Sequence, residues 1–112
     1  MRRFVFTIAT VEMAICFAVL AMPTSVRADG DAAKVYKTNC VLCHAADGSG
    51  TSPSGKAMKA KDLRSAEVQG KTDAELEDFI TKGQGKMPAF EKKLSPETIK
   101  SLVAYIRALP KQ

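Results

Sequence analysis

Apolar side chains recur at the spacing of an α-helix in three parts of this chain. The first helix is predicted over residues 31–40, and Asp29 or Asp31 can cap its start. Its apolar face contains Ala32, Val35 and Tyr36. This apolar face ends at a pair of cysteines.

Two further helices have clear start signals. Thr72 and Glu75 have the spacing of a capping box, and Gly83 offers a stop for the helix between them. The apolar face of this helix contains Leu76, Phe79 and Ile80. Ser95 and Pro96 begin the last predicted helix as N-cap and first-turn proline. Its apolar face contains Ile99, Leu102, Val103, Ile106 and Leu109, and Pro110 ends it.

The segments between these helices are rich in Gly, Pro, Ser and Thr. Residues 45–61 and 83–94 are therefore predicted to be loops, and a short helix is predicted over residues 62–69. No segment alternates long enough to predict a strand. The pattern indicates an all-α domain of three to five short helices separated by long loops. Loops of this length in so small a domain are expected to wrap around a bound group.

Residues 1–28 differ from the rest of the chain. Two arginines precede an apolar run that ends at Met22, and small and polar residues follow up to Ala28. This order is typical of a secretory signal, so we expect residues 29–112 to form a periplasmic domain after cleavage. A lipoprotein start at Cys16 is one alternative, but Ile15 stands where a small residue is expected. The other is an uncleaved membrane anchor, since a membrane span takes about 20 residues. Glu12, in the middle of the run, disfavours that alternative by roughly 2.5–3.5 kcal/mol.

The charge of the chain is mildly positive, at +5, with 17 basic and 12 acidic residues. Loss of residues 1–28 would remove three arginines and one glutamate, which leaves 14 against 11 and a charge of +3. This small excess, without a basic helix that has interleaved aromatic residues, gives no indication of nucleic-acid binding. We expect a monomer with no stable membrane insertion after cleavage. Because a domain of this size buries only a modest core, we also expect it to need a further stabilising group.

The motif CVLCH contains Cys40, Cys43 and His44, and His44 is the only histidine in the chain. A thioredoxin-like redox pair is expected in a βαβ setting, and no strand is predicted here. A structural zinc site takes four protein ligands, and these residues supply three. Covalent haem attachment needs two thiols, which form thioethers with the porphyrin, and an adjacent imidazole that binds the iron. The motif therefore predicts one covalently bound haem c.

The sixth ligand of the haem iron is predicted to be a methionine, because no second histidine exists. Met58 lies among lysines at the edge of a loop and is expected to be exposed or gap-filling. Met87 lies in the sequence GKMPAF, where glycines allow close approach of the backbone and Phe90 can pack on the porphyrin. We therefore predict His44 and Met87 as the axial ligands.

The motifs CVLCH and KMPAF, together with the ending SLVAYIRAL, resemble those of the class I c-type cytochromes. The resemblance extends over residues 29–111. It implies that an N-terminal helix over residues 31–40 and a C-terminal helix over residues 96–109 cross beside the haem. It also implies that a proline carbonyl accepts the Nδ1–H of the proximal histidine, and Pro53 is the candidate in this chain.

One position departs from part of this family. Photosynthetic members often have a glutamine near the haem, in the helix before the methionine loop. The corresponding position here is Phe79. The resemblance therefore favours a respiratory or metabolic bacterial carrier.

The predicted function is one-electron transfer. Iron with two axial ligands leaves no position for a substrate, so we expect an electron carrier and not an enzyme. The expected partners are redox proteins with acidic docking surfaces, since Lys82, Lys86, Lys92 and Lys93 flank the methionine loop. Three alternatives remain open. They are a haem protein with an open or labile sixth site that acts in ligand binding or peroxidase chemistry, an electron-entry subunit of a larger oxidoreductase, and a thiol–disulfide protein without haem.

Overall fold

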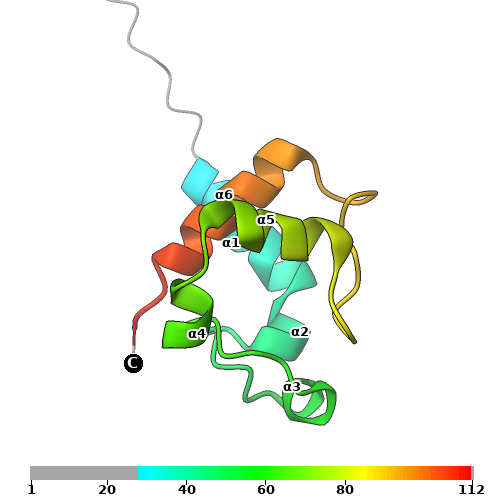
Figure 1. Ribbon diagram of the computed structural model, residues 1–112, viewed down its shortest axis with the longest axis vertical. Helices are drawn as coiled ribbons and strands as arrows, with labels where there is room; N and C mark the ends of the chain where they lie inside the picture. The colour runs from blue at the N-terminus through cyan, green and yellow to red at the C-terminus, as the bar shows by residue number, and fades with distance from the viewer. Residues whose placement is uncertain (1–27, 112) are drawn as a thin grey trace, which may run out of the picture.

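The computed structural model describes residues 28–111, and Figure 1 shows their arrangement. Six helices lie in this range: α1 (Ala28–Asn39), α2 (Val41–His44), α3 (Pro53–Met58), α4 (Ala66–Gln69), α5 (Asp73–Lys82) and α6 (Pro96–Arg107). The only β-type pairing among the described residues is an isolated bridge between Gln84 and Met87. The all-α prediction is therefore confirmed. The predicted signal over residues 1–28 lies, apart from its last residue, outside the described residues.

The two longest helices, α1 and α6, pack against each other and form the centre of the core (Figure 1). The rings of Tyr36 in α1 and Tyr105 in α6 lie with their centroids 4.9 Å apart. Leu102 and Val103 are almost completely buried, as the apolar face of α6 requires. Among the described residues, no helix combines the length and the apolar character that crossing a membrane would need.

Helix α5 packs on α6 through Leu76 and Ile80, which are both buried. Its predicted capping box is confirmed. Thr72 Oγ1 accepts the N–H of Glu75 at 3.2 Å, and the Glu75 carboxylate accepts the N–H of Thr72 at 2.7 Å. These reciprocal bonds satisfy two donors that would otherwise be unpaired at the start of the helix. The helix ends at Gly83, as predicted.

Arg107 joins the end of α6 to the connection between α4 and α5. Its guanidinium donates to the Asp73 carboxylate at 3.0 Å and to the backbone carbonyl of Gln69 at 2.8 Å, and it also bonds the carbonyl of Lys71. A planar group with five donors suits this set of divergent acceptors. The contacts hold the short helix α4 beside the end of α6.

The loop prediction for residues 45–61 is wrong in part, because α3 forms within it. Ser52 caps this helix by accepting the N–H of Gly55 at 3.0 Å, and Pro53 occupies its first turn. Helix α3 also packs closely against α2. A Cβ atom on Gly55 would lie 2.0 Å from the carbonyl oxygen of Cys43. The cap and this close contact stabilise a helix in a segment whose glycines predicted a loop. The described residues therefore contain six helices, more than the predicted three to five.

Candidate functional site

Two adjoining cavities, of about 220 and 430 Å³, lie between α2 and the loop of residues 83–94, and α5 borders only the smaller one. They share six lining residues: Cys40, His44, Lys61, Gln84, Met87 and Phe90. The larger cavity also reaches α3 through Met58, whereas the smaller one reaches α6 through Leu102 and Ile106. Cofactor pockets typically have volumes of roughly 300–1,000 Å³, so the two cavities together can hold a group of cofactor size.

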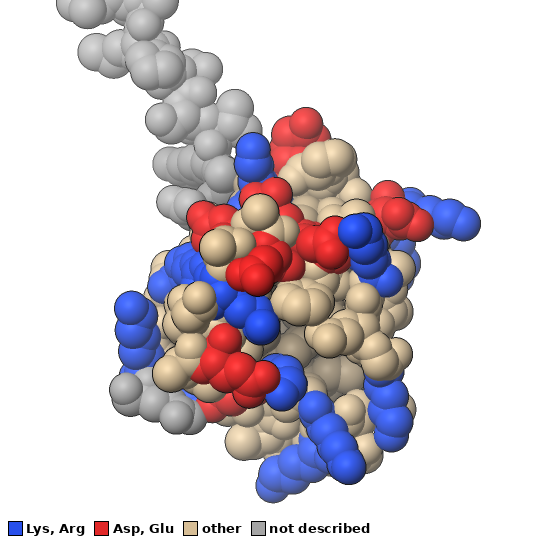
Figure 2. Space-filling model, in the orientation of Figure 1, with Lys and Arg blue, Asp and Glu red and all other residues tan. Residues whose placement is uncertain are grey.

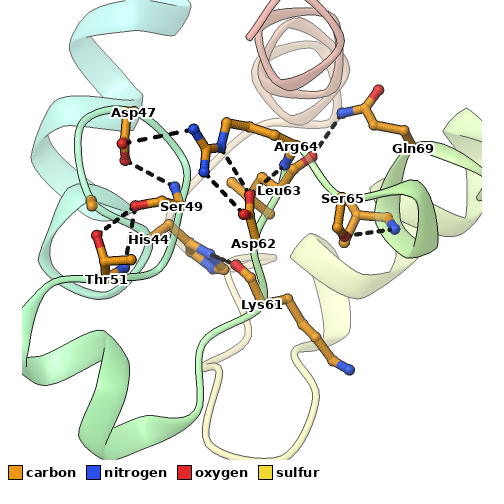
Figure 3. Close-up of polar contacts among 12 residues, drawn as sticks. His44, Asp47, Ser49, Thr51, Lys61, Asp62, Leu63, Arg64, Ser65 and Gln69 are labelled. Atoms are coloured by element: carbon orange, nitrogen blue, oxygen red, sulfur yellow. Dashed lines mark hydrogen bonds and ion pairs between the residues drawn. The ribbon is translucent and has the colours of Figure 1, made fainter. Parts of the chain in front are cut away.

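His44 is the last residue of α2, and its imidazole is oriented by a single backbone acceptor. Its Nδ1 lies 3.0 Å from the carbonyl oxygen of Lys61 (Figure 3). A carbonyl oxygen can only accept, so Nδ1 carries the proton and Nε2 of the neutral ring keeps its lone pair. Burial lowers the pKa of His44, and the bond to Lys61 opposes that shift in part. The neutral ring with a bare Nε2 is the form that binds a metal.

The prediction that Pro53 supplies this acceptor is wrong, since the acceptor is the carbonyl of Lys61. Pro53 is the first residue of α3, and that helix begins where Ser52 bonds the end of α2. The chain then turns at Lys59, which has a left-handed backbone conformation with φ of 55°. The segment after this turn, and not the helix before it, passes the imidazole.

The segment that contains the Lys61 carbonyl is held by Arg64, as Figure 3 shows. The Arg64 guanidinium makes two bonds of 3.0 Å to the Asp62 carboxylate and lies 3.9 Å from the carboxylate of Asp47. Asp47 belongs to the loop that follows His44, so one side chain links the two segments. A backbone bond of 2.8 Å from the Leu63 N–H to the Gly48 carbonyl links them a second time. Sequence patterns gave no signal for this arrangement.

The two cysteines of the motif form no disulfide, and both line the larger cavity. Burial, and then the neighbouring Cys43, raises the pKa of Cys40 to about 11. A protonated thiol is a poor redox nucleophile, so the burial of Cys40 disfavours a thiol–disulfide role for this cysteine. Within the described residues, no three His, Cys, Asp or Glu side chains gather closely enough to hold a metal ion.

Met87 lines both cavities together with His44, whereas Met58 lines only the larger one. Two backbone bonds between Gln84 and Met87, of 3.1 and 2.9 Å, close the tight turn that carries Met87. Met58 lies at the end of α3 and is 49% exposed. Phe90, the predicted packing residue, is buried and forms part of the wall of both cavities.

Phe79, which the family resemblance matched to a glutamine of photosynthetic members, lies at the smaller cavity. Phe79 lines this cavity, and the ammonium group of Lys71 lies 5.3 Å from the centroid of its ring. A cation over an aromatic face is attracted by the ring electrons. The Phe79 ring that α5 contributes to the wall of this cavity is therefore apolar, and the Lys71 ammonium group lies over it.

The donor set fits a haem better than it fits a simple metal ion. One neutral imidazole, two thioethers, two thiols and mostly apolar walls lie around the two adjoining cavities, and Met87 carries the thioether that lines both. A haem needs axial nitrogen or sulfur ligands and a large apolar contact surface, and it needs no carboxylates. His44, Met87, Cys40 and Cys43 are the residues that would hold it.

Comparison with known proteins agrees with this chemistry. Residues 27–106 match the family model described as cytochrome c oxidase, cbb3-type, subunit III. Cytochrome c6 of Nostoc sp. is 30% identical over 91% of this chain and 89% of its own length. Cytochrome c6 of Microcystis aeruginosa is 35% identical over 70% of this chain and 93% of its own length. The cbb3-type oxidase subunit FixP of Bradyrhizobium sp. is 37% identical over 69% of this chain, but the chain spans only 26% of FixP.

Solved structures give the same result. The KustC0563 c-type cytochrome superposes with a TM-score of 0.66 and 33% identity, over 71% of this chain and 98% of its own. Cytochrome c6 of the diatom Phaeodactylum tricornutum superposes with a TM-score of 0.53 and 30% identity, over 70% of this chain and 90% of its own. The chain belongs to the class I c-type cytochromes, which bind haem c covalently.

Proposed function

We propose that this protein is a periplasmic one-electron carrier in which Cys40 and Cys43 hold haem c as thioethers and His44 and Met87 bind its iron. The observation that carries the proposal is the shared cavity wall. Met87 lines both cavities beside an imidazole whose Nε2 is bare. Bound haem supplies an iron that can exchange one electron. The periplasmic location rests on the signal pattern of residues 1–28.

The residues around the site have separate tasks in this proposal. The Lys61 carbonyl keeps the proton of His44 on Nδ1, which orients the ring and increases the basicity of Nε2. The bonded turn from Gln84 to Met87 holds the thioether in a fixed place. Apolar walls such as Phe90 exclude water from the cavity. Ligands held in this way need little rearrangement when the charge of the site changes.

A spectrum and a redox titration of the exported protein test the proposal. We expect a red protein whose mass exceeds that of the chain by one haem, and this increase should survive acid–acetone extraction. The oxidised form should show the weak far-red band of methionine-bound ferric haem, and the titration should follow a one-electron curve. Absence of the band, together with ready binding of carbon monoxide by the reduced form, would instead support the open-site alternative.

An electron-entry role in a larger oxidoreductase is the second candidate, because the family model and FixP both belong to cbb3-type oxidases by description. The same four haem-binding residues would serve that role. Affinity purification of the full-length chain from membranes of its native cell discriminates the two. Stoichiometric copurification of oxidase subunits would support the second candidate, and recovery of the protein alone would support the free carrier.

A further inference from the structure

Helix α2 is a single turn, and donors from outside the helix satisfy its last carbonyl groups. It has four residues and no side-chain cap at its start. The Ser52 hydroxyl lies 2.7 Å from the carbonyl oxygen of Leu42 and 3.1 Å from that of Cys43. The N–H of Gly50 donates to the His44 carbonyl at 2.8 Å. A helix of one turn is not stable by itself, so the position of His44 depends on contacts of this kind.

Tyr36 bonds the backbone at both ends of the CVLCH motif. Its carbonyl accepts the N–H of Cys40 at 2.8 Å, and its hydroxyl donates to the carbonyl of Ala45, the residue after His44, at 2.8 Å. The donors described above come from the segment that follows the motif, whereas Tyr36 belongs to α1 and is buried. Its ring packs against that of Tyr105 in α6. The Tyr36 hydroxyl therefore joins the core formed by α1 and α6 to the backbone beside His44.

Ala45 has a backbone conformation that residues with a side chain rarely adopt. Its φ is 63° and its ψ is 165°, a combination found almost only in glycine. The Ala45 N–H still donates to the Val41 carbonyl at 2.9 Å and so completes the turn of α2. Strain of this kind persists only where surrounding contacts hold the backbone. At the Ala45 carbonyl these contacts are the Tyr36 hydroxyl and, at 3.2 Å, the N–H of Gly48.

We infer that Tyr36 is a positioning residue for His44: its hydroxyl holds Ala45 in the strained conformation and so fixes the backbone from which the imidazole projects. This inference rests on the proposed function, because it takes His44 as the iron ligand. The ligand is then held twice, at Nδ1 by the Lys61 carbonyl and at its backbone through Tyr36. Phenylalanine in place of Tyr36 would keep the packing on Tyr105 and lose the bond to Ala45, so the role belongs to the hydroxyl.

Tyr36→Phe in the haem-loaded protein tests the inference. NMR of the reduced form measures the solvent exchange of the His44 Nδ1–H, and a redox titration measures the potential. The first control is Tyr105→Phe, which removes the hydroxyl of the neighbouring ring, a group with no hydrogen bond to another described residue. The second control is Ser95→Ala, which removes one hydrogen bond to the N–H of Thr98 at the start of α6. It shows what a loss of stability alone does.

We expect the His44 ring proton to exchange about ten-fold faster in Tyr36→Phe, because the loss of one hydrogen bond favours local opening by about this factor. The potential should rise, since a looser Nδ1–H bond makes the imidazole less basic. The charged surface in Figure 2, which is acidic over α5 and basic near α3, is the same in all these variants, so it cannot cause the rise. Unchanged exchange in Tyr36→Phe, or an equal increase in either control, would overturn the inference.

Ala45→Gly tests the part of the inference that concerns strain. Glycine adopts a positive φ without a Cβ clash, so this backbone no longer needs the Tyr36 hydroxyl to hold it. The exchange rate and the potential of Tyr36→Phe/Ala45→Gly should therefore differ little from those of Ala45→Gly alone. An equal effect of Tyr36→Phe in both backgrounds would show that the hydroxyl does not act through Ala45, and it would overturn the inference. A wild-type protein without haem, or without a one-electron titration, would instead count against the proposed function.

Discussion

The Nδ1–H of His44 donates to the backbone carbonyl of Lys61 at 3.0 Å. This bond joins two segments that lie far apart in the sequence, and it fixes the tautomer of the only histidine in the chain. The backbone around the acceptor is in turn held by the Arg64 guanidinium between Asp62 and Asp47. The proposed haem ligand is therefore oriented through a carbonyl whose position depends on a side chain outside the cavity.

The first prediction concerns this indirect support. Arg64→Lys keeps the charge but loses the two-bond contact with Asp62, so the Lys61 carbonyl should become less well held. We expect a lower free energy of unfolding, because the two bonds to Asp62 are lost. We also expect a higher redox potential, because a weaker Nδ1–H bond makes the imidazole less basic. Faster solvent exchange of the His44 ring proton, measured by NMR, should accompany the change in potential.

The matched control for this prediction is Arg107→Lys. Arg107 is also a partly exposed arginine that bonds a carboxylate and backbone carbonyls, but it joins α6 to the connection between α4 and α5. Its loss should reduce stability by a similar amount and leave the ring-proton exchange of His44 unchanged. If Arg107→Lys alters that exchange as much as Arg64→Lys does, the effect is general loosening and not support of the ligand.

The second prediction concerns the contact between α3 and α2. Gly55→Ala would place a methyl group 2.0 Å from the Cys43 carbonyl oxygen and 2.5 Å from the Gly50 carbonyl oxygen. Both atoms belong to the backbone and cannot move independently, so we expect a loss of about 3 kcal/mol or more and a low yield of holoprotein. Denaturant unfolding of the purified protein measures the loss.

Gly85→Ala is the control for this packing effect. Gly85 has φ of +57° and no atom within 4 Å of an added Cβ, so only backbone strain of about 1–2 kcal/mol is expected there. An argument from φ alone would predict the larger loss of stability at Gly85, which has a positive φ, and the smaller loss at Gly55. A smaller loss in Gly55→Ala than in Gly85→Ala would show that α3 can shift away from α2.

The sequence predicted the parts of the fold that depend on local signals. The capping box of Thr72 and Glu75 and the Ser95–Pro96 start act within one helical turn, and both helices begin where they were predicted to begin. Ser52 and Pro53 form the same pattern of N-cap and first-turn proline, but the glycines on both sides favoured the prediction of a loop. The short helix α3 is stabilised by its contact with α2, which a sequence pattern does not reveal.

The residues of the candidate site were also predictable only where a local pattern in the sequence indicates them, and not where they depend on long-range packing. The CVLCH motif is contiguous, so its residues could be assigned from their order in the chain. The acceptor for His44 depends on how the chain turns after α3, and the family pattern led to Pro53 when the structure has Lys61. Leu42 and Met58 line the same cavity because α2 and α3 pack together, and neither residue stands out in the sequence.

The third prediction concerns pH. Burial raises the pKa of Tyr36, which is 1% exposed and donates to the Ala45 carbonyl at 2.8 Å. An unfolded tyrosine ionises near pH 10, whereas the folded one keeps its proton, so this stabilisation is complete below about pH 10 and is lost as the pH rises further. The loss should approach about 1.4 kcal/mol per pH unit.

Urea unfolding of the wild type and of Tyr36→Phe at about pH 9 and about pH 11 tests this effect, because the variant has no proton to lose at this position. The variant should be less stable at the lower pH by about 1 kcal/mol, the contribution of the lost hydrogen bond. At the higher pH the difference should disappear or change sign. A constant difference across the range would mean that Tyr36 does not titrate differently in the folded and unfolded states.

The fourth prediction separates the two methionines. Met87→Ala removes the thioether that shares both cavities with His44, so the oxidised protein should lose the far-red band of methionine-bound iron. Its redox potential should fall, because methionine ligation raises the potential, and the reduced form should bind carbon monoxide. Met58→Ala removes a half-exposed thioether that lines only the larger cavity, and it should keep both the band and the potential close to those of the wild type. Loss of the band in Met58→Ala with its retention in Met87→Ala would reverse the ligand assignment.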